Sequence, residues 1–227
     1  MRRIADNISE IRERIHAFEQ RYQRPADAVK LLAVSKKQPE ALIREAFAAG
    51  QRDFGENYLQ EAEEKITALA DLEINWHFIG PIQSNKTRSI ARLCQWVHSV
   101  DRLKIARRLS DQRDPALPPL NICIQVNLSG EDSKSGVDPS ATEELCRQVA
   151  ALPNLAVRGL MSIPAAETDF QRQRAQFQRL ATRFYRLQES FPQFDTLSMG
   201  MSNDFEAAIA EGSTMVRLGT ALFGPRI

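Results

Sequence analysis

The sequence lacks the features that mark several large classes of protein. Its 227 residues include 30 Lys and Arg against 29 Asp and Glu, so it has no excess positive charge to neutralise nucleic-acid phosphates. Its three cysteines, Cys94, Cys123 and Cys146, form no CxxC pair, which is typical of reduced thiols in a cytoplasmic protein. The longest segment without a charged residue, Pro115–Gly130, contains three prolines and is shorter than the ~20 apolar residues of a membrane span. We therefore expect a cytoplasmic protein that binds neither nucleic acid nor membranes.

The sequence also lacks an export signal and an internal linker. Met1-Arg-Arg-Ile-Ala-Asp leads directly into charged, helix-like sequence, with no apolar segment behind the basic residues. Hydrophobic residues make up 43% of the chain and the net charge is +1, which disfavours intrinsic disorder. A chain of this length buries a sizeable core without disulfides or metals. Because no low-complexity stretch divides the sequence, we expect one domain over residues 1–227.

Short apolar runs, typical of strands, alternate along the chain with longer amphipathic segments, typical of helices. The strand-like runs are Leu31–Val34, Arg52–Phe54, Asn75–Ile79, Trp96–Val100, Asn121–Asn127, Leu155–Leu160, Asp195–Leu197 and Thr214–Arg217. The helix-like segments that follow them are Glu40–Ala49, Tyr58–Ala70, Lys86–Leu93, Leu103–Arg113, Ser140–Ala151, Phe170–Ser190, Phe205–Ala210 and Thr220–Phe223. Strands alternating with helices predict a parallel sheet, and eight such units in 227 residues predict an α/β fold, a single (β/α)8 barrel of the TIM type.

Two further observations refine this fold prediction. Ile4, Ile8, Ile11, Ile15 and Phe18 recur every three or four residues, which predicts an extra N-terminal helix before the first strand. An open doubly wound sheet is the alternative architecture. The absence of a GxGxxG sequence after the first predicted strand counts against a dinucleotide-binding version of that fold.

Two lysines follow the first predicted strand. In a β/α barrel the functional site lies at the C-terminal ends of the strands, so Lys36 or Lys37 could enter the mouth of the barrel. Neighbouring ammonium groups and partial burial lower the pKa of a lysine, and a neutral lysine attacks aldehydes to form a Schiff base. A pair of solvated loop lysines is the alternative, and this segment alone favours that alternative.

Two glycine-containing loops near the C-terminus strengthen the functional interpretation. Ser198–Asp204 leads into a predicted helix, for which Asn203 is the expected N-cap, and offers hydroxyl and backbone N–H groups to an anion. Arg217–Pro225 contains Gly219, which permits close backbone approach, and Thr220, which offers a hydroxyl. In β/α barrels a phosphate commonly binds between the loops after strands seven and eight. A reactive lysine with a phosphate cradle indicates pyridoxal 5′-phosphate or a phosphorylated aldehyde or ketose.

A series of short motifs extends from the first predicted strand to the end of the chain. They are Leu31-Leu-Ala-Val-Ser-Lys36, Phe54-Gly-Glu-Asn57, Trp76-His-Phe-Ile-Gly80, Gln83-Ser-Asn-Lys86, His98-Ser-Val-Asp101, Gln125-Val-Asn127, Ser133-Lys-Ser-Gly136, Gly159-Leu-Met-Ser-Ile-Pro164, Leu197-Ser-Met-Gly-Met-Ser-Asn-Asp204, Val216-Arg-Leu-Gly219 and Phe223-Gly-Pro-Arg226. So many motifs in register are highly specific. In these motifs the chain resembles the pyridoxal-phosphate homeostasis proteins from end to end.

The resemblance implies a fold, a cofactor and a role. The fold would be a barrel like the N-terminal domain of bacterial alanine racemase. Pyridoxal 5′-phosphate would be bound through a Schiff base on Lys36, with Asn57 near the ring substituents. The family is regarded as having no demonstrated enzymatic reaction. Its role is to bind, buffer and deliver vitamin B6, with effects on amino-acid and keto-acid balance, and apo-enzymes that use the cofactor are the expected recipients.

The resemblance also assigns the contacts to the rest of the cofactor. Ser202, Gly219 and Thr220 would hold the phosphate, with Met201 beside it. Arg217 would face the pyridine nitrogen. Most enzymes that use this cofactor place a carboxylate there, which keeps the nitrogen protonated and makes the ring an electron sink. An arginine accepts no proton, so we expect the ring to remain a poor sink and the chain to bind its cofactor without turnover.

An amino-acid racemase that uses Lys36 is the alternative function. In alanine racemases a tyrosine from a separate β-domain supplies the second acid or base. This sequence ends at Ile227, directly after the predicted barrel, so we expect that domain to be absent, and Tyr22, Tyr58 and Tyr185 fall in helical segments. A sugar-phosphate aldolase, which would form its Schiff base with substrate, is a more distant alternative. We expect the protein to be a monomer.

Three remaining patterns are interpreted as structural. His77 and His98 lie in strand-like segments and are predicted to be hydrogen-bonded structural residues. No set of His, Cys, Asp and Glu has metal-ligand spacing, so no metal site is predicted. Five arginines share one predicted helix, namely Arg172, Arg174, Arg179, Arg183 and Arg186. A solvated face is the favoured interpretation of these arginines, and a docking surface for a partner or RNA is the alternative.

Overall fold

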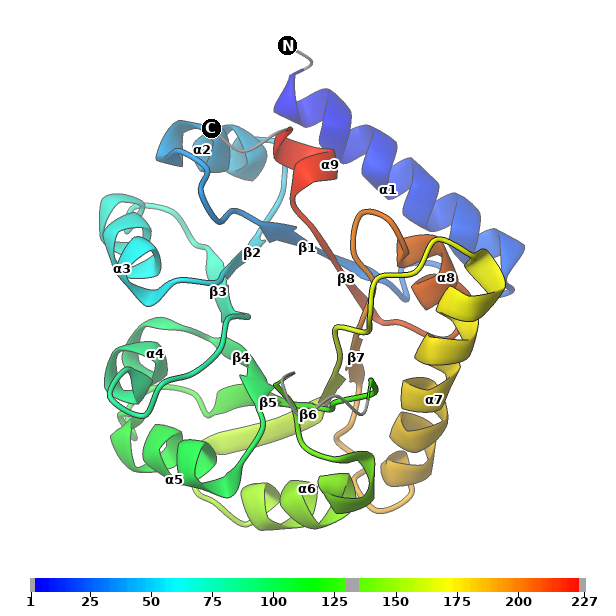
Figure 1. Cartoon of the computed structure of the whole chain (residues 1–227). Helices are drawn as coiled ribbons and strands as arrows, with labels where there is room; N and C mark the ends of the chain where they lie inside the picture. Colours follow the sequence, from blue (N-terminus) through cyan, green and yellow to red (C-terminus); the bar gives the residue numbers. More distant parts are fainter. Residues whose placement is uncertain (1–2, 130–134, 225–227) are drawn as a thin grey trace.

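Parallel strands close into a barrel at the centre of the molecule (Figure 1). The structure is a computed structural model that describes residues 3–129 and 135–224. Its strands are β1 (Lys30–Val34), β2 (Asp53–Glu56), β3 (Asn75–Phe78), β4 (Trp96–Val100), β5 (Leu120–Gln125), β6 (Leu155–Met161), β7 (Thr196–Ser198) and β8 (Met215–Leu218). Each strand pairs with the next along the chain, and β8 pairs with β1 to close the sheet. The predicted barrel is confirmed, and the open doubly wound sheet is excluded.

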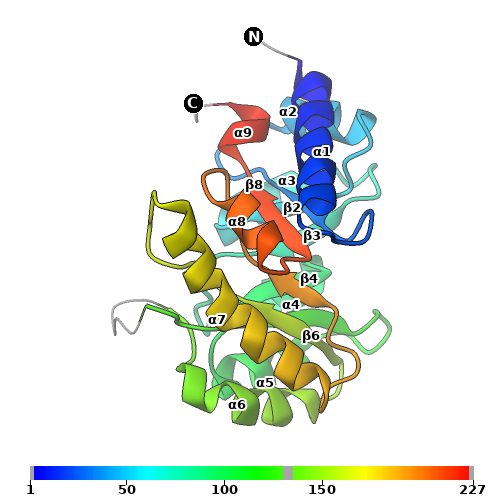
Figure 2. The same cartoon turned by 90° about the vertical axis from the view of Figure 1, so that its right-hand side faces the viewer.

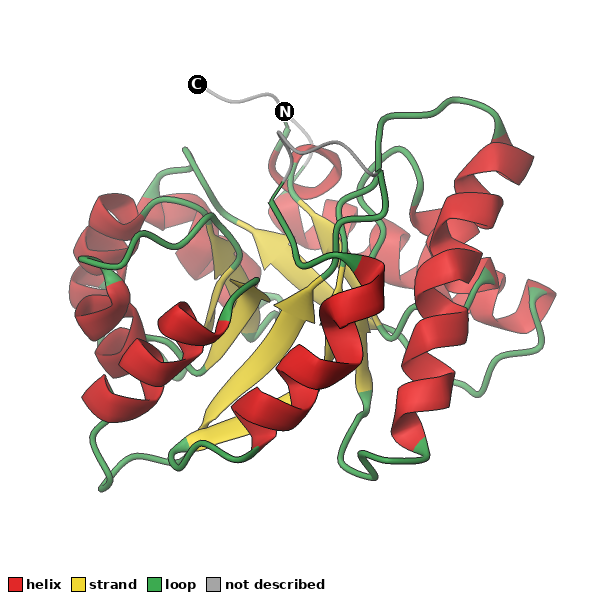
Figure 3. Ribbon diagram, turned by 60° about the horizontal axis from the view of Figure 1, so that its bottom comes forward, coloured by secondary structure: helices red, strands yellow, loops and turns green. Residues whose placement is uncertain are grey.

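Helices surround the barrel on its outer side (Figures 1 and 3). They are α1 (Ile4–Arg21), α2 (Glu40–Ala48), α3 (Leu59–Ala68), α4 (Thr87–Leu93), α5 (Leu103–Gln112), α6 (Thr142–Ala150), α7 (Phe170–Gln188), α8 (Phe205–Ala210) and α9 (Thr220–Phe223), with a 3₁₀ turn η1 (Pro139–Ala141) before α6. Asp138 begins η1 by accepting a hydrogen bond from the backbone N–H of Ser140 at 2.7 Å. Each helix-like segment of the sequence therefore corresponds to helix in the structure.

The two faces of each strand pack into different layers. On β1, Leu31 and Ala33 belong to the main hydrophobic core, which lies between the sheet and the helices. Leu32 and Val34 point the other way and form a separate small cluster with Ile79 and Met215. Because side chains alternate along a strand, the second set faces the interior of the barrel.

Helix α1 completes the helical layer beside the seam between β8 and β1. It packs against α2, α8 and α9 (Figure 2), and the helix that directly follows β8, α9, contains only four residues. The side-chain amide of Asn7 donates a hydrogen bond to the carbonyl of Leu222 at 2.8 Å, and the guanidinium of Arg14 lies 4.7 Å from the ring centre of Phe205. The predicted extra N-terminal helix is confirmed, and it covers apolar surface that α9 is too short to reach.

Several smaller observations complete the description. Cys94, Cys123 and Cys146 are free and buried, as expected for reduced thiols. Within the described residues, no helix is both long enough and apolar enough to cross a membrane. Two motifs quoted for the family resemblance, Ser133–Gly136 and Phe223–Arg226, extend outside the residues that the structure describes.

Candidate cofactor-binding site

The predicted site residues follow or lie within four neighbouring strands, near their C-terminal ends. They are Lys36 after β1, Asn57 after β2, Met201 and Ser202 after β7, Arg217 within β8, and Gly219 and Thr220 after β8. The strand order around the barrel is β7, β8, β1 and β2. Because parallel strands end at the same rim, the fold brings all of these residues to one side of the barrel mouth.

The two lysines in the loop after β1 differ in their exposure. Lys36 is half-buried, whereas Lys37 is exposed and has a φ of 57°. The backbone N–H of Lys37 donates a hydrogen bond to the carboxylate of Glu61 on α3. Lys36 lies in the turn that directly follows β1, at the rim of the barrel, and it is the more buried of the two lysines.

A buried ion pair supports this loop from the outer side of the sheet. Lys65 of α3 places its Nζ 2.8 Å from Oε1 of Glu56, 2.6 Å from the carboxylate of Glu61 and 2.7 Å from the carbonyl of Ser35. The hydroxyl of Ser35 also donates to Glu56 at 2.7 Å. Burial raises the pKa of Glu56 despite the lysine, and its second oxygen, Oε2, has no hydrogen-bond partner among the described residues.

The sequence analysis missed this ion pair. Lys65 lies on the same helical stripe as the buried residues Leu59 and Ala62, at intervals of three. A charged residue on a buried stripe predicts a buried partner, and this signal was available in the sequence.

The two C-terminal loops present polar groups that have no partner of their own. The hydroxyl and backbone N–H groups of Ser202 and Thr220 donate to no acceptor among the residues described. A Cβ added at Gly219 would lie 3.0 Å from the carbonyl oxygen of Val34, so only glycine fits there without displacing β1. These donors are suited to an anion.

The start of α8 differs from the prediction. Asp204, not Asn203, is the N-cap residue, and its carboxylate accepts a hydrogen bond at 2.5 Å from the backbone N–H of Met201 instead of capping the helix. Both residue types favour N-caps, so the sequence alone does not decide between neighbouring positions. The half-buried Met201 is thereby fixed between the glycine turn of this loop and α8.

Asn57 sits beside a second point of close backbone approach. A Cβ at Gly80 would collide with the carbonyl oxygen of Asn57, so the glycine allows the loops after β2 and β3 to meet. The side-chain amide of Asn57 has no hydrogen-bond partner among the described residues. It therefore offers both a donor and an acceptor to a bound molecule.

Arg217 is a buried cation inside the barrel. Its side chain is on the inward face of β8, and the residue is 4% exposed. One terminal nitrogen donates to Oγ of Ser198 at 2.8 Å and the other to the carbonyl of Ser162 at 2.9 Å. Burial lowers the pKa of Arg217 to about 10, which still leaves it charged at neutral pH. The hydroxyl of Ser162 is buried without a hydrogen-bond partner in the described part of the chain.

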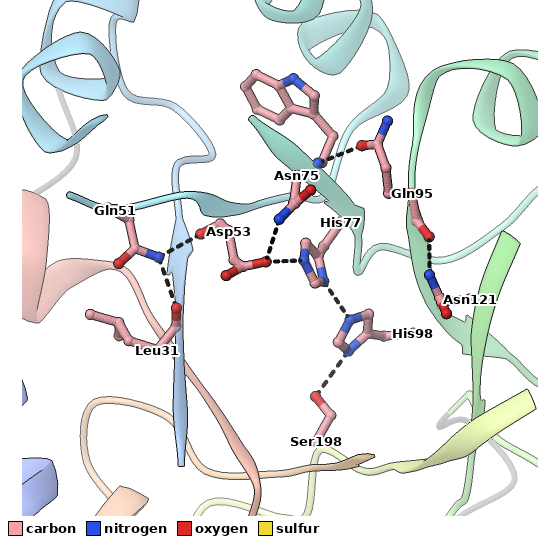
Figure 4. A network of polar contacts seen from close by, with 10 residues as sticks. Leu31, Gln51, Asp53, Asn75, His77, Gln95, His98, Asn121 and Ser198 are labelled. Carbon is pink, nitrogen blue, oxygen red and sulfur yellow. Dashed lines mark hydrogen bonds and ion pairs between the residues drawn. The ribbon is translucent and has the colours of Figure 1, made fainter. Parts of the chain in front are cut away.

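Both buried histidines are hydrogen-bonded, as predicted. Nε2 of His77 lies 3.1 Å from the carboxylate of Asp53, and Nδ1 of His77 lies 2.9 Å from Nε2 of His98 (Figure 4). Nδ1 of His98 lies 2.9 Å from Oγ of Ser198. Burial lowers the pKa of both imidazoles. No local pattern in the sequence indicates that this line of contacts leads on to Arg217.

The structure also bears on the metal prediction and on the arginines of α7. Among the described residues, no group of three or more His, Cys, Asp and Glu is arranged to hold a metal ion. Three arginines of α7 bind within the chain: Arg172 and Arg174 pair with Glu167 and Glu211, and Arg179 donates to the carbonyl of Leu128. These contacts fit a solvated, locally paired helix face better than a docking surface.

Taken together, the rim residues suit one kind of molecule. Unpartnered hydroxyl and N–H donors suit a phosphate, a buried guanidinium suits an uncharged ring nitrogen, and a half-buried lysine suits an aldehyde. Pyridoxal 5′-phosphate carries all three of these groups, and a phosphorylated aldehyde carries two of them.

Comparison with known sequences places the chain in a family. The model of the alanine racemase N-terminal domain matches residues 4–226. The pyridoxal phosphate homeostasis protein of Pseudomonas aeruginosa is 59% identical over 226 residues, which cover 100% of this chain and 97% of the relative. The protein of the same name from Escherichia coli K12 is 51% identical over 229 residues, which cover 100% of this chain and 98% of the relative.

Solved structures agree with this placement. PipY of Synechococcus elongatus, solved with PLP bound, superposes with a TM-score of 0.84 at 40% identity and covers 97% of this chain and 100% of its own. A protein from Bifidobacterium adolescentis superposes with a TM-score of 0.89 at 34% identity, over 97% of this chain and 94% of its own. The alanine racemase of Corynebacterium glutamicum shares the fold, with a TM-score of 0.71 at 18% identity over 98% of this chain and 60% of the racemase. The chain therefore belongs to the alanine racemase N-terminal domain family and, within it, to the pyridoxal phosphate homeostasis proteins.

Proposed function

We propose that this chain binds pyridoxal 5′-phosphate covalently on Lys36 and acts in vitamin B6 homeostasis, holding and delivering the cofactor without turning over a substrate. The observation that carries the proposal is the set of donors on Ser202 and Thr220 that have no acceptor in the described part of the chain, on the same rim as Lys36 and the buried Arg217. Membership of a family of homeostasis proteins supports the role.

Each rim residue has a distinct part in binding. Ser202, Gly219 and Thr220 would hold the phosphate through hydroxyl and backbone N–H groups, because charged acceptors form strong hydrogen bonds with such donors. Met201 would lie beside the phosphate, and the unpartnered amide of Asn57 would contact the ring substituents.

Lys36 would make the covalent attachment. Its Nζ would join the aldehyde carbon of the cofactor as a Schiff base, with release of one water and no net oxidation or reduction. The buried network of Ser35, Glu56 and Lys65 holds the backbone of this loop in place from behind. Lys36 is therefore presented at a fixed point of the rim.

Arg217 explains why binding would not lead to turnover. When bound, the cofactor supplies an aldehyde for amines and a ring that stabilises negative charge best when its nitrogen is protonated. Arg217 remains a cation at neutral pH although burial lowers its pKa to about 10, and its guanidinium, which donates to Ser198 and to the carbonyl of Ser162, has only donors to offer. A nitrogen that accepts a hydrogen bond from Arg217 stays unprotonated, so carbanion formation is not promoted.

The attachment is tested by chemical trapping. Purified protein loaded with pyridoxal 5′-phosphate is reduced with borohydride and mapped by peptide mass spectrometry, alongside Lys36→Ala and the matched control Lys37→Ala. We expect the adduct on Lys36 in the wild type and in Lys37→Ala, and no yellow colour in Lys36→Ala. An adduct on Lys37, or wild-type colour in Lys36→Ala, contradicts the assignment. A colourless protein that binds no pyridoxal 5′-phosphate would instead favour the aldolase alternative.

The absence of turnover is tested by hydrogen exchange at Cα. L-Alanine is incubated with the loaded protein in deuterated water, where exchange reports carbanion formation even without net product. We expect exchange no faster than with free pyridoxal 5′-phosphate. Faster exchange that is lost in Lys36→Ala would establish the racemase alternative. Arg217→Glu, if it folds and binds the cofactor, should raise exchange, because a carboxylate keeps the ring nitrogen protonated.

The wider role includes components that the site itself does not display. We propose apo-enzymes that require pyridoxal 5′-phosphate as the recipients, and a cytoplasmic monomer of one domain as the working form. Transfer is checked by mixing loaded protein with such an apo-enzyme and following its activation against an equal amount of free cofactor. Sedimentation of the purified protein measures its oligomeric state.

A further inference from the structure

A line of hydrogen-bonded side chains crosses the interior of the barrel. It starts at Asp53, the first residue of β2, passes through His77 on β3 and His98 on β4, reaches Ser198, the last residue of β7, and ends at Arg217 on β8. Figure 4 shows its first four members in sequence. The four links measure 3.1, 2.9, 2.9 and 2.8 Å, all within hydrogen-bonding distance. We call these five residues the interior chain.

The two ends of the interior chain fix the position of every proton in it. Arg217 has only donors, so Oγ of Ser198 accepts from it at one end. At the other end, burial raises and the His77 hydrogen bond lowers the pKa of Asp53, with a net downward shift, so Asp53 is a carboxylate and accepts from Nε2–H of His77. A neutral His77 then has a bare Nδ1, which accepts from Nε2–H of His98.

The last link follows from the same reasoning. A neutral His98 with its proton on Nε2 has a bare Nδ1, which accepts from the hydroxyl of Ser198. The opposite arrangement would place the bare Nε2 of His77 against the Asp53 carboxylate, and two acceptors would face each other at 3.1 Å. Only one direction therefore satisfies all four links while Asp53 is ionised and the imidazoles are neutral.

Charged neighbours of the interior chain are few and come from identified strands. Lys30 on β1 acts on both Asp53 and His77, and it disfavours a charged imidazole. Arg217 has the same effect on His98. Asp204, from the loop after β7, is the acidic side chain that acts on Arg217, and burial keeps the thiol of Cys123 neutral beside it. Burial and these cations keep both rings neutral, so the line of donors runs unbroken from Arg217 to Asp53.

We propose that Asp53, His77, His98 and Ser198 are positioning residues, which orient Arg217 towards the ring nitrogen of the bound cofactor through a line of hydrogen bonds whose direction the Asp53 carboxylate sets. The inference rests on the proposed function, in which Arg217 meets that nitrogen. Two of the five N–H groups of the guanidinium are held by Ser198 and Ser162, and three remain for the ring. Removing the acceptor at Ser198 frees the guanidinium to turn, and the ring nitrogen then loses its donor.

The first test needs no cofactor. Long-range ¹H–¹⁵N NMR of the cofactor-free protein reports which nitrogen of each histidine carries the proton. The whole protein has three histidines. His16→Gln removes the signals of the one on the surface helix α1 and serves as the assignment control. We expect Nε2–H on both His77 and His98, with neither ring titrating near its ordinary pKa of about 6.5. A proton on Nδ1 of either ring, or a charged ring at neutral pH, overturns the proposal.

The second test asks whether the interior chain acts on the ring nitrogen. Dissociation constants are measured for pyridoxal 5′-phosphate and for its analogue in which a C–H replaces the ring nitrogen. We expect the wild type to prefer the natural cofactor by about tenfold or more, because a charge-assisted hydrogen bond is lost in the analogue. In Ser198→Ala the ratio of the two dissociation constants should fall close to one. Asp53→Asn, which keeps an acceptor for His77 and removes only the charge, should give an intermediate value.

The control and the contrary outcomes separate this inference from the proposed function. Ser110→Ala removes a buried hydroxyl that donates to the carbonyl of Pro153 outside the interior chain, and it should keep the wild-type preference. If Ser198→Ala weakens both compounds equally, the serine is merely structural and the proposal fails. Equal dissociation constants for the two compounds in the wild type would show that Arg217 does not contact the ring nitrogen. That result would also overturn the proposal. Failure of both compounds to attach to Lys36 would instead refute the proposed function, whatever the NMR result.

Discussion

Two buried polar networks approach the same rim from opposite sides of the sheet. The outer one, Ser35, Glu56 and Lys65, lies between the barrel and α3 and joins two full charges directly. The interior chain separates its charges, Asp53 and Arg217, by two neutral imidazoles and a hydroxyl. The two networks differ in the part of the molecule that they hold in place. An ion pair with short contacts fixes the backbone of a loop, whereas a line of directional hydrogen bonds fixes the orientation of one side chain.

The two networks should therefore fail in different ways when they are broken. Loss of the outer network should mainly lower the stability of the fold, because it leaves a buried charge without its partner. Loss of a link in the interior chain should mainly change what the rim recognises, because removal of a neutral member leaves no buried charge without its partner. The predictions that follow test this contrast, beginning with the largest expected effect.

The largest effect is expected when the outer ion pair is broken. Lys65→Met leaves Glu56 buried and uncompensated, and we expect a loss of about 3–5 kcal/mol in the free energy of unfolding. Urea denaturation followed by circular dichroism measures it. Adding Glu56→Gln should recover much of the loss, because the stranded charge is then absent. The preference for the ring nitrogen should survive in the double variant, since the interior chain is intact, and a loss of that preference would show that the two networks are not separate.

The outer network also illustrates what the sequence does and does not predict. The alternation of apolar runs was sufficient for the barrel, because local periodicity determines both element type and buried face. Two partners of Lys65, Ser35 directly after β1 and Glu56 at the end of β2, lie 30 and nine residues earlier in the sequence, and only the packing of α3 against the sheet brings them together.

The same limit applies to the interior chain. His77 and His98 lie on adjacent strands, and His77 pairs in register with Trp96, so their contact follows once the strand order is known. Ser198 comes from β7, 100 residues after His98, and it meets that ring across the barrel interior. No local pattern predicts such a contact, because it depends on the closure of the whole sheet. The misplaced N-cap at Asn203 is a third case, in which neighbouring Asn and Asp have equal propensities.

A second prediction concerns the phosphate. Hydrogen bonds to a charged group are worth about 1.5–3 kcal/mol each, so pyridoxal without its phosphate should bind at least about tenfold more weakly. Ser202→Ala and Thr220→Ala should each narrow that gap, whereas Thr67→Ala, on the exposed face of α3, should leave it unchanged. Calorimetric titration with both compounds measures the gap. Equal affinities for the two compounds would show that the C-terminal loops do not hold a phosphate.

A third prediction follows from the neutral histidines of the interior chain. Their folded-state pKa values are lowered, so below about pH 6.5 the unfolded state binds protons that the folded state does not, and stability falls as the pH falls. Between about pH 7.5 and 5.5 we expect a loss of about 1 kcal/mol for each buried histidine. Glu56, whose pKa is raised, acts in the opposite direction at the acid end of this window.

Variants isolate the contribution of the histidines to this pH dependence. His98→Asn keeps an acceptor for Ser198 but has no group that titrates, so its stability should fall less steeply with acid than that of the wild type. Thr67→Ala, on the exposed face of α3, removes no titratable group and should leave the slope unchanged. Unfolding free energies from urea denaturation at several pH values provide the slopes. An identical slope in His98→Asn and the wild type would mean that the pKa of His98 is the same in the folded and unfolded states.

The smallest effect is expected at an ion pair on the surface, and it sharpens the meaning of the buried one. Arg44 of α2 makes two contacts with Asp71, at 2.7 and 2.8 Å, and a third with the carbonyl of Ala68 at 3.0 Å. By geometry it is at least as well connected as Lys65. Both members of this ion pair are exposed, however, and water solvates each charge when the other is removed. Arg44→Met should therefore leave the unfolding midpoint within experimental error, with no dependence on salt beyond that of the wild type. A loss comparable to that of Lys65→Met would show that contact geometry, and not burial, determines the contribution of these ion pairs to the stability of the barrel.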